Sequence, residues 1–282
     1  MKTCLKPAVT AVALFLLFCS FSGSASAQSA SADHHLDVRL ISERTALVPG
    51  ETTNVGLHFK LAPGWHIYWI NAGDAGEPPR VLWTLPRAIT AGKIQWPTPQ
   101  RLVADSLVNY GYTNSALLIV PLSVRSSFRE QKVRLLADVN WLVCREICIP
   151  GISHLSLTLP VSSTSRPTVF TALFRRTRAT QPRPLPSHWT ASLADTKNHF
   201  VLRVKTGKRL AKATFIPRHS LQVANDAIQQ VQPLPHGVQI TLQKSEELLN
   251  PITRLDGLLV LSKNVSYKIS APVTPGPAAN RN

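Results

Sequence analysis

The distribution of proline is the feature that most limits how this chain can fold. The 282 residues include 22 prolines and 13 glycines, and proline interrupts the hydrogen-bond ladder of a long helix. Between the prolines, apolar and polar residues alternate in short runs such as 35–40 and 53–59, and turn pairs such as Pro63-Gly64 separate the runs. Short alternating runs bounded by turns predict β-strands in a sandwich.

The first 27 residues are expected to lie outside this fold. Lys2 and Lys6 precede an apolar run from Ala8 to Phe21, and the small residues Ala25-Ser26-Ala27 end the segment. This pattern is typical of a cleaved secretory signal peptide. The run is shorter than the ~18 apolar residues of a membrane span, although an uncleaved anchor is the alternative. We expect no transmembrane segment in the mature chain.

Two β-like regions separated by a proline-rich linker predict an all-β protein with two sandwich domains. The expected segments are a signal peptide (1–27), a flexible leader (28–35), a first sandwich (36–161), a linker (162–187), a second sandwich (188–273) and a disordered tail (274–282). Within the linker, Thr168 to Ala179 are expected to form one short helix, with Val169, Phe170 and Leu173 on its apolar side.

The charge balance is strongly basic, with 31 Lys and Arg against 15 Asp and Glu, a net charge of +16. The basic residues are dispersed, and Arg175-Arg176-Thr177-Arg178 is the one dense cluster. A dispersed charge is typical of a solvated surface. We therefore expect no nucleic-acid partner.

Beyond the predicted signal peptide the chain has two cysteines, Cys144 and Cys148. In a fully extended segment their Cα atoms would lie roughly 13 Å apart, too far for a disulfide, so the strand ending near Val143 is expected to bend. A bridge closing so short a loop stabilises the fold by only about 2 kcal/mol. Strain in a tight bridge would ease its reduction. Redox exchange, a structural bridge and metal ligation all remain open.

A second cluster combines aromatic residues with a loop rich in glycine and proline. The segment 64–69 contains two tryptophans, a histidine and a tyrosine, and the loop 71–79 follows it. Most of these rings are expected in the core. Loops on a rigid sandwich often carry function, so we interpret 71–79 as a cover for the cysteine pair.

Several of these motifs occur together in a known family. They are Pro63-Gly64-Trp65-His66-Ile67-Tyr68-Trp69, Asn71, Gly73-Asp74-Ala75-Gly76, Pro78-Pro79, Trp96-Pro97, Tyr110-Gly111-Tyr112 and Val143-Cys144-Arg145-Glu146-Ile147-Cys148-Ile149-Pro150-Gly151. In this order they resemble the N-terminal periplasmic region of DsbD and, more closely, that of ScsB-type proteins. The segment 255–273 is similar to the second sandwich of ScsB-type chains.

The resemblance implies two immunoglobulin-like sandwiches and a periplasmic thiol–disulfide interchange activity without a cofactor. It assigns the mixed disulfide to Cys148 and the resolving thiol to Cys144. The candidate surroundings of this site are Tyr68, Asp74, Glu77, Tyr110 and Tyr112. The electron donor is expected to be a separate thioredoxin-like or DsbD-type membrane reductase, with oxidised periplasmic proteins as acceptors. The C-x3-C spacing is shorter than that of DsbD itself. Because the donor and the acceptor are both expected to be separate proteins, the direction of electron flow stays open.

Two other functions fit the same residues. Cys144 and Cys148 with His66 or His154 would suit Cu(I), a soft ion. Alternatively, the chain is a non-catalytic binding module in which Trp65, Tyr68, Trp69 or Tyr112 form an exposed platform and the cysteines brace a loop.

Overall fold

A computed structural model describes residues 29–33, 35–104 and 106–274. The predicted signal peptide and residues 275–282 of the predicted tail therefore lie outside the described residues. The described part is almost entirely β-structure with one short helix, as predicted. The helical residues of this part form no segment long and apolar enough to cross a membrane.

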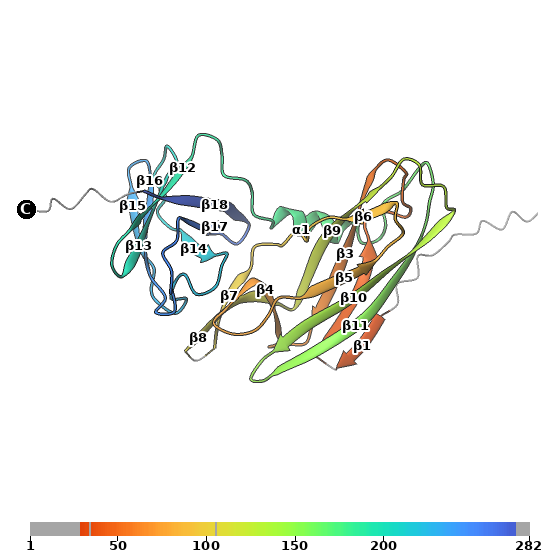
Figure 1. Ribbon diagram of the computed structural model, residues 1–282, viewed down its shortest axis with the longest axis horizontal. Helices are drawn as coiled ribbons and strands as arrows, with labels where there is room; N and C mark the ends of the chain where they lie inside the picture. Colours follow the sequence, from red (N-terminus) through yellow and green to blue (C-terminus); the bar gives the residue numbers. More distant parts are fainter. Residues whose placement is uncertain (1–28, 34, 105, 275–282) are drawn as a thin grey trace, which may run out of the picture.

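The first β unit consists of two sheets (Figure 1). One sheet has the order β1-β2-β3-β9-β6, formed by Ser29–Asp33, Leu36–Ser42, Thr52–Leu61, Ser115–Val124 and Ile89–Ala91. The other has the order β11-β10-β4-β8-β7, formed by Cys148–Pro160, Lys132–Cys144, His66–Gly73, Leu107–Thr113 and Gln100–Ala104. Strand β5 (Arg80–Thr84) pairs with β10. The segment predicted as a leader thus contributes strand β1, which pairs with β2.

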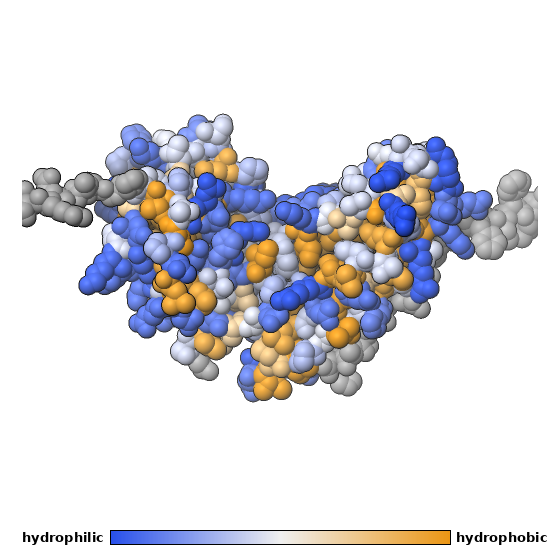
Figure 2. Space-filling model, in the orientation of Figure 1, coloured by the Kyte–Doolittle hydropathy of each residue, from blue (hydrophilic) through white to orange (hydrophobic). Residues whose placement is uncertain are grey.

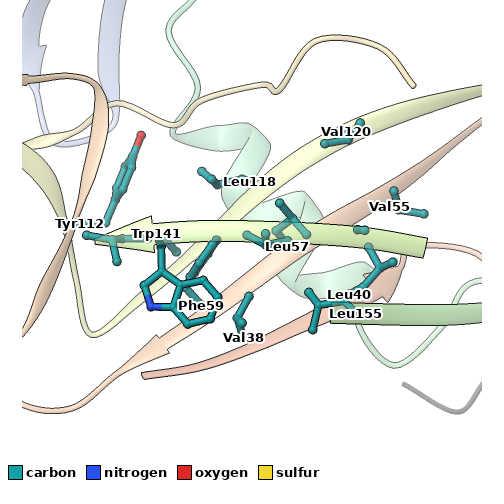
Figure 3. Packing of buried hydrophobic residues seen from close by; sticks show 14 of the residues in the cluster. Val38, Leu40, Val55, Leu57, Phe59, Tyr112, Leu118, Val120, Trp141 and Leu155 are labelled. Carbon is teal, nitrogen blue, oxygen red and sulfur yellow. The ribbon is translucent and has the colours of Figure 1, made fainter. Parts of the chain in front are cut away.

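The two sheets are held together by the side chains that alternate inward along each strand. Leu57 and Phe59 of β3 point into the same core as Trp141 of β10 and Leu155 of β11 (Figure 3). The rings of Phe59 and Trp141 meet edge to face with their centroids 6.5 Å apart. This packing makes the β10–β11 hairpin a rigid part of the sandwich as far as its end.

The predicted helix forms over Thr171–Ala179 (α1) and covers the outer face of the first sheet. Its anchor is Phe174, which is fully buried against Leu117 and Ile119 of β9. The expectation that Val169 belongs to the apolar side is wrong, since Val169 precedes the helix and is 90% exposed. Proline at 167 and the start of the helix at 171 leave Val169 outside the helical periodicity.

The second β unit is one path of seven strands with its own core. In spatial order the strands are β14 (Thr214–Pro217), β17 (Arg254–Ser262), β18 (Val265–Thr274), β12 (Thr190–Asp195), β13 (His199–Lys205), β16 (Gly237–Gln243) and β15 (Gln230–Leu234). Figure 1 shows this unit beside the end of the first unit where β4, β7 and β8 lie.

Candidate redox site

The two cysteines close the end of the β10–β11 hairpin. The strands pair in register from Lys132 and Pro160 to Cys144 and Cys148, and only residues 145–147 connect them. The facing cysteines form a disulfide with a Cα–Cα distance of 4.1 Å. The predicted bend after Val143 is therefore a three-residue hairpin turn, and it brings the sulfurs together at the rim of the sheet.

The two halves of the bridge have different surroundings. Cys144 also pairs with His66 of β4, so it lies inside the sheet and is only 2% exposed. Its neighbours are Tyr68, Ala72 and Leu142. Cys148 begins the edge strand β11 and is exposed. An incoming thiolate therefore has access to Cys148 before Cys144.

The candidate residue Tyr68 is in contact with the bridge. Its hydroxyl lies 3.5 Å from Sγ of Cys148, and because a bridged sulfur carries no hydrogen, the hydroxyl is the donor. Burial raises the pKa of Tyr68 to about 12. The phenol therefore stays protonated at neutral pH and keeps a donor directed at Cys148.

His66 lies on the other side of Tyr68, with the two rings edge to face and 5.1 Å apart. Burial lowers the pKa of His66 below its ordinary value of 6.5, which favours the neutral ring. Its Nε2 is buried and has no hydrogen-bond partner in the part of the chain that the structure describes. The imidazole beside Cys144 is therefore uncharged at neutral pH.

The loop 74–79, which follows β4, covers Tyr68. Gly76 has φ of +94°, and a Cβ at that position would lie 2.1 Å from Cζ of Tyr68. The loop backbone therefore packs directly on the ring. Asp74 anchors the loop by accepting a 2.7 Å hydrogen bond from the backbone N–H of Val108, whereas Glu77 forms an exposed ion pair with Arg80.

The remaining candidates, Tyr110 and Tyr112, are buried in strand β8 and bond to groups other than the cysteines. The Tyr110 hydroxyl donates to Oδ1 of Asn225 at 3.1 Å, and the Tyr112 hydroxyl donates to the carbonyl of Pro97 at 2.8 Å. Burial raises the pKa of both phenols. Of the five candidates, Tyr68 alone has a direct contact with the bridge among those that the described residues show.

Sequence reasoning missed Asn225, which comes from the second unit. It is buried and bonds to both Tyr110 and Asp74. A lone asparagine in a loop carries no periodic or motif signal. Only the arrangement of the two units shows its connection to the loop 74–79.

The structure bears on both alternative functions, the exposed aromatic platform and the Cu(I) site. Trp65, Tyr68, Trp69 and Tyr112 are each at most 5% exposed, so the expectation of an exposed aromatic platform is wrong. Trp65, Trp69 and Tyr112 pack in the core between the sheets, and Tyr68 packs beneath the loop 74–79. The described residues contain no group of three or more His, Cys, Asp and Glu arranged to hold a metal ion. His154 instead lies 2.7 Å from Asp138 and is exposed.

Comparison with known proteins agrees with this geometry. Residues 37–160 match the family model described as thiol:disulfide interchange protein DsbD, N-terminal. No curated protein matches the chain in sequence. The N-terminal periplasmic domain of ScsB from Proteus mirabilis superposes with a TM-score of 0.67 at 17% identity, covering 89% of this chain and 98% of that chain.

A protein of unknown function from Porphyromonas gingivalis W83 covers 84% of this chain and 99% of its own at 11% identity, but its TM-score of 0.25 supports no inference. The ScsB domain shares the fold over nearly its full length. Residues 37–160 thus match the DsbD N-terminal domain family, the fold is shared with the ScsB periplasmic domain, and the predicted resemblance to both is confirmed.

Proposed function

We propose that this chain is a periplasmic thiol–disulfide interchange protein that passes electrons between a reductase donor and oxidised protein partners. The observation that carries the proposal is the bridge between buried Cys144 and exposed Cys148 at the end of a rigid hairpin. One sulfur is open to attack and the other is sheltered. The match of residues 37–160 to the DsbD N-terminal family supports the same chemistry.

In the reducing half-cycle a donor thiolate attacks Sγ of Cys148. The bridge breaks, Cys144 leaves as a thiolate that takes up a proton, and a mixed disulfide joins the donor to Cys148. The donor's second thiol then loses its proton and attacks the donor sulfur of that mixed disulfide. Cys148 is released, the donor becomes a disulfide, and two electrons have moved to this chain.

In the oxidising half-cycle the Cys148 thiolate attacks a disulfide of the acceptor protein. One acceptor sulfur leaves as a thiolate, and the other remains bound to Cys148. Cys144 then attacks Sγ of Cys148, which releases the acceptor as a dithiol and restores the bridge. The short hairpin turn keeps Cys144 within reach of Cys148, so the resolving step needs no large movement.

The tip of the hairpin offers an apolar surface for such partners. Ile147, between the cysteines, is 66% exposed, and Ile152, further along β11, is 58% exposed. Figure 2 shows hydrophobic residues at the end of this hairpin, at the lower centre of the view. We propose a separate thioredoxin-like or DsbD-type membrane reductase as donor. A periplasmic location agrees with the predicted signal peptide, and the oxidising periplasm is a compartment in which such a bridge can form.

The experiment that tests the proposal is the capture of the mixed disulfide. The reduced Cys144→Ala variant is mixed with a thioredoxin that keeps only its attacking cysteine, activated as a thionitrobenzoate disulfide so that no second thiol can release Cys148, and the products are separated without reductant. We expect a covalent complex through Cys148, whereas the matched Cys148→Ala variant should give much less. Reduced thioredoxin should also reduce the wild-type bridge. Absence of both reactions, or a potential far below about −300 mV, would indicate a permanent structural bridge.

A further inference from the structure

The second unit contacts the first unit, near the strand β4 that carries Tyr68, through a buried interface. Ile216 of β14 and Leu258 of β17 are at most 5% exposed and belong to the core cluster of the first unit. Nearby, the side-chain amide of Asn71 donates a 2.8 Å hydrogen bond to the carbonyl of Pro217. Apolar packing combined with buried hydrogen bonds fixes the position of the loops at this contact.

Asn225 is the centre of the polar part of this contact. Its Nδ2 donates to Oδ1 of Asp74 at 2.7 Å, and its Oδ1 accepts from the Tyr110 hydroxyl at 3.1 Å. Its backbone carbonyl accepts from Nη2 of Arg101 at 3.0 Å. The Tyr110 hydroxyl donates and the Asp74 carboxylate accepts, so the Asn225 side-chain amide must turn its oxygen to Tyr110 and its nitrogen to Asp74.

A continuous set of contacts leads from Asn225 to the disulfide. Asn225 holds Asp74, which begins the loop 74–79. Two residues later, Gly76 lies on the ring of Tyr68. The hydroxyl of that ring lies 3.5 Å from Sγ of Cys148. The position of the loop therefore determines how closely the Tyr68 hydroxyl is held against the sulfur.

We infer that Asn225 is a positioning residue of the redox site, through which the second unit sets the acidity of Cys148. The inference rests on the proposed function for its biological meaning, but its test does not require a redox partner. When the bridge is reduced, the Tyr68 hydroxyl can donate to the Cys148 thiolate, and a hydrogen bond to the charged form lowers a pKa. Loosening the loop weakens that bond and raises the thiol pKa.

The test is the pH dependence of iodoacetamide alkylation at Cys148 in the reduced full-length chain, followed by mass spectrometry. Asn225→Asp removes the donor and places a second carboxylate against Asp74, while keeping the acceptor for Tyr110. We expect a higher Cys148 pKa and an alkylation rate at pH 7 about three- to tenfold lower than wild type. Tyr68→Phe removes the hydroxyl completely and gives the reference value of the Cys148 pKa without that hydrogen bond.

Three further variants separate positioning from general damage. Asp74→Asn alone keeps one acceptor oxygen, so it loses either the bond from Asn225 or the bond from the Val108 N–H that anchors the same loop. Either loss should raise the Cys148 pKa, which keeps the test valid if Asn225→Asp does not fold. The double variant Asp74→Asn/Asn225→Asp exchanges donor and acceptor and should restore the wild-type rate. Ser266→Ala removes the 2.5 Å contact with Thr98, which also joins the two units, and should leave the pKa unchanged.

The inference is overturned if the pKa of Cys148 in both Asn225→Asp and Asp74→Asn equals that of the wild type. It is also overturned if Ser266→Ala raises the pKa as much as they do, since the effect would then come from a loosened contact between the units. Failure of the proposed function has a separate signature. The wild-type bridge would then not exchange with thioredoxin, whatever the pKa of Cys148.

Discussion

The hydroxyl of Tyr68 lies 3.5 Å from Sγ of Cys148, although 80 positions separate the two residues in the chain. The contact links strand β4 to the first residue of β11 across the intervening strand β10. It places a protonated phenol at the exposed half of the bridge. A donor at this position favours the thiolate that forms when the bridge opens.

Replacing Tyr68 by Phe should make the bridge harder to reduce. The ring is retained, so packing changes little, but the hydrogen bond that favours the reduced thiolate is lost. We expect the equilibrium reduction potential to become more negative by up to about 30 mV, equivalent to one hydrogen bond to a charged group. Redox titration in glutathione or dithiothreitol buffers measures the shift. An unchanged or less negative potential would show that the hydroxyl does not act on the thiolate.

Replacing Gly76 by Ala should destabilise the loop 74–79. The new Cβ would lie 2.1 Å from Cζ of Tyr68, at a residue with φ of +94°. We expect a loss of about 2 kcal/mol or more in the free energy of unfolding. Gly207 is the matched control, because its φ is +76° and nothing lies within 4 Å of the added Cβ; Gly207→Ala should cost about 1 kcal/mol. Equal losses in urea unfolding would contradict the close packing on Tyr68.

His66 should make the oxidised protein less stable as the pH falls through the weakly acidic range. Burial lowers the pKa of folded His66 below 6.5, so below pH 6.5 the unfolded chain binds a proton that the folded chain does not. The free energy of unfolding therefore decreases as the pH falls below 6.5. In urea unfolding at pH 7.5 and 5.5, His66→Gln should lose less stability than wild type. The exposed His236→Gln control should behave as wild type, and identical pH dependence in all three would refute the assignment.

Phe174 should be the residue that fixes helix α1 to the first sheet. Its side chain is fully buried against Leu117 and Ile119, and truncation of a buried phenylalanine costs about 3–5 kcal/mol. We expect Phe174→Ala to lower the midpoint of urea unfolding clearly. Val169→Ala is the control, since Val169 is 90% exposed and should change the midpoint little. A comparable effect of both variants would place the helix anchor elsewhere.

The sequence predicted the elements whose signals are local. Strands and turns were predictable because their signals depend only on neighbouring residues. The signals are the alternation along β3 and β9, the turn pair at Pro63-Gly64 and the spacing of Cys144 and Cys148. Phe174 was missed because the residue that anchors a short helix depends on which of its faces the sheet covers. The burial of most of the aromatic rings was predicted and is confirmed, whereas the contact of Tyr68 with Cys148 depends on how the strands are ordered.

The sequence by itself determined an all-β chain with a single pair of neighbouring cysteines after its predicted signal peptide, because strand periodicity and cysteine spacing are properties of short segments. The tertiary structure decided that Cys144 is buried and Cys148 exposed, that Tyr68 donates to the bridge, and that Asn225 holds the loop above it. These relationships join residues between 4 and 151 positions apart in the chain. Only strand order and the contact between the two units bring the distant residues together.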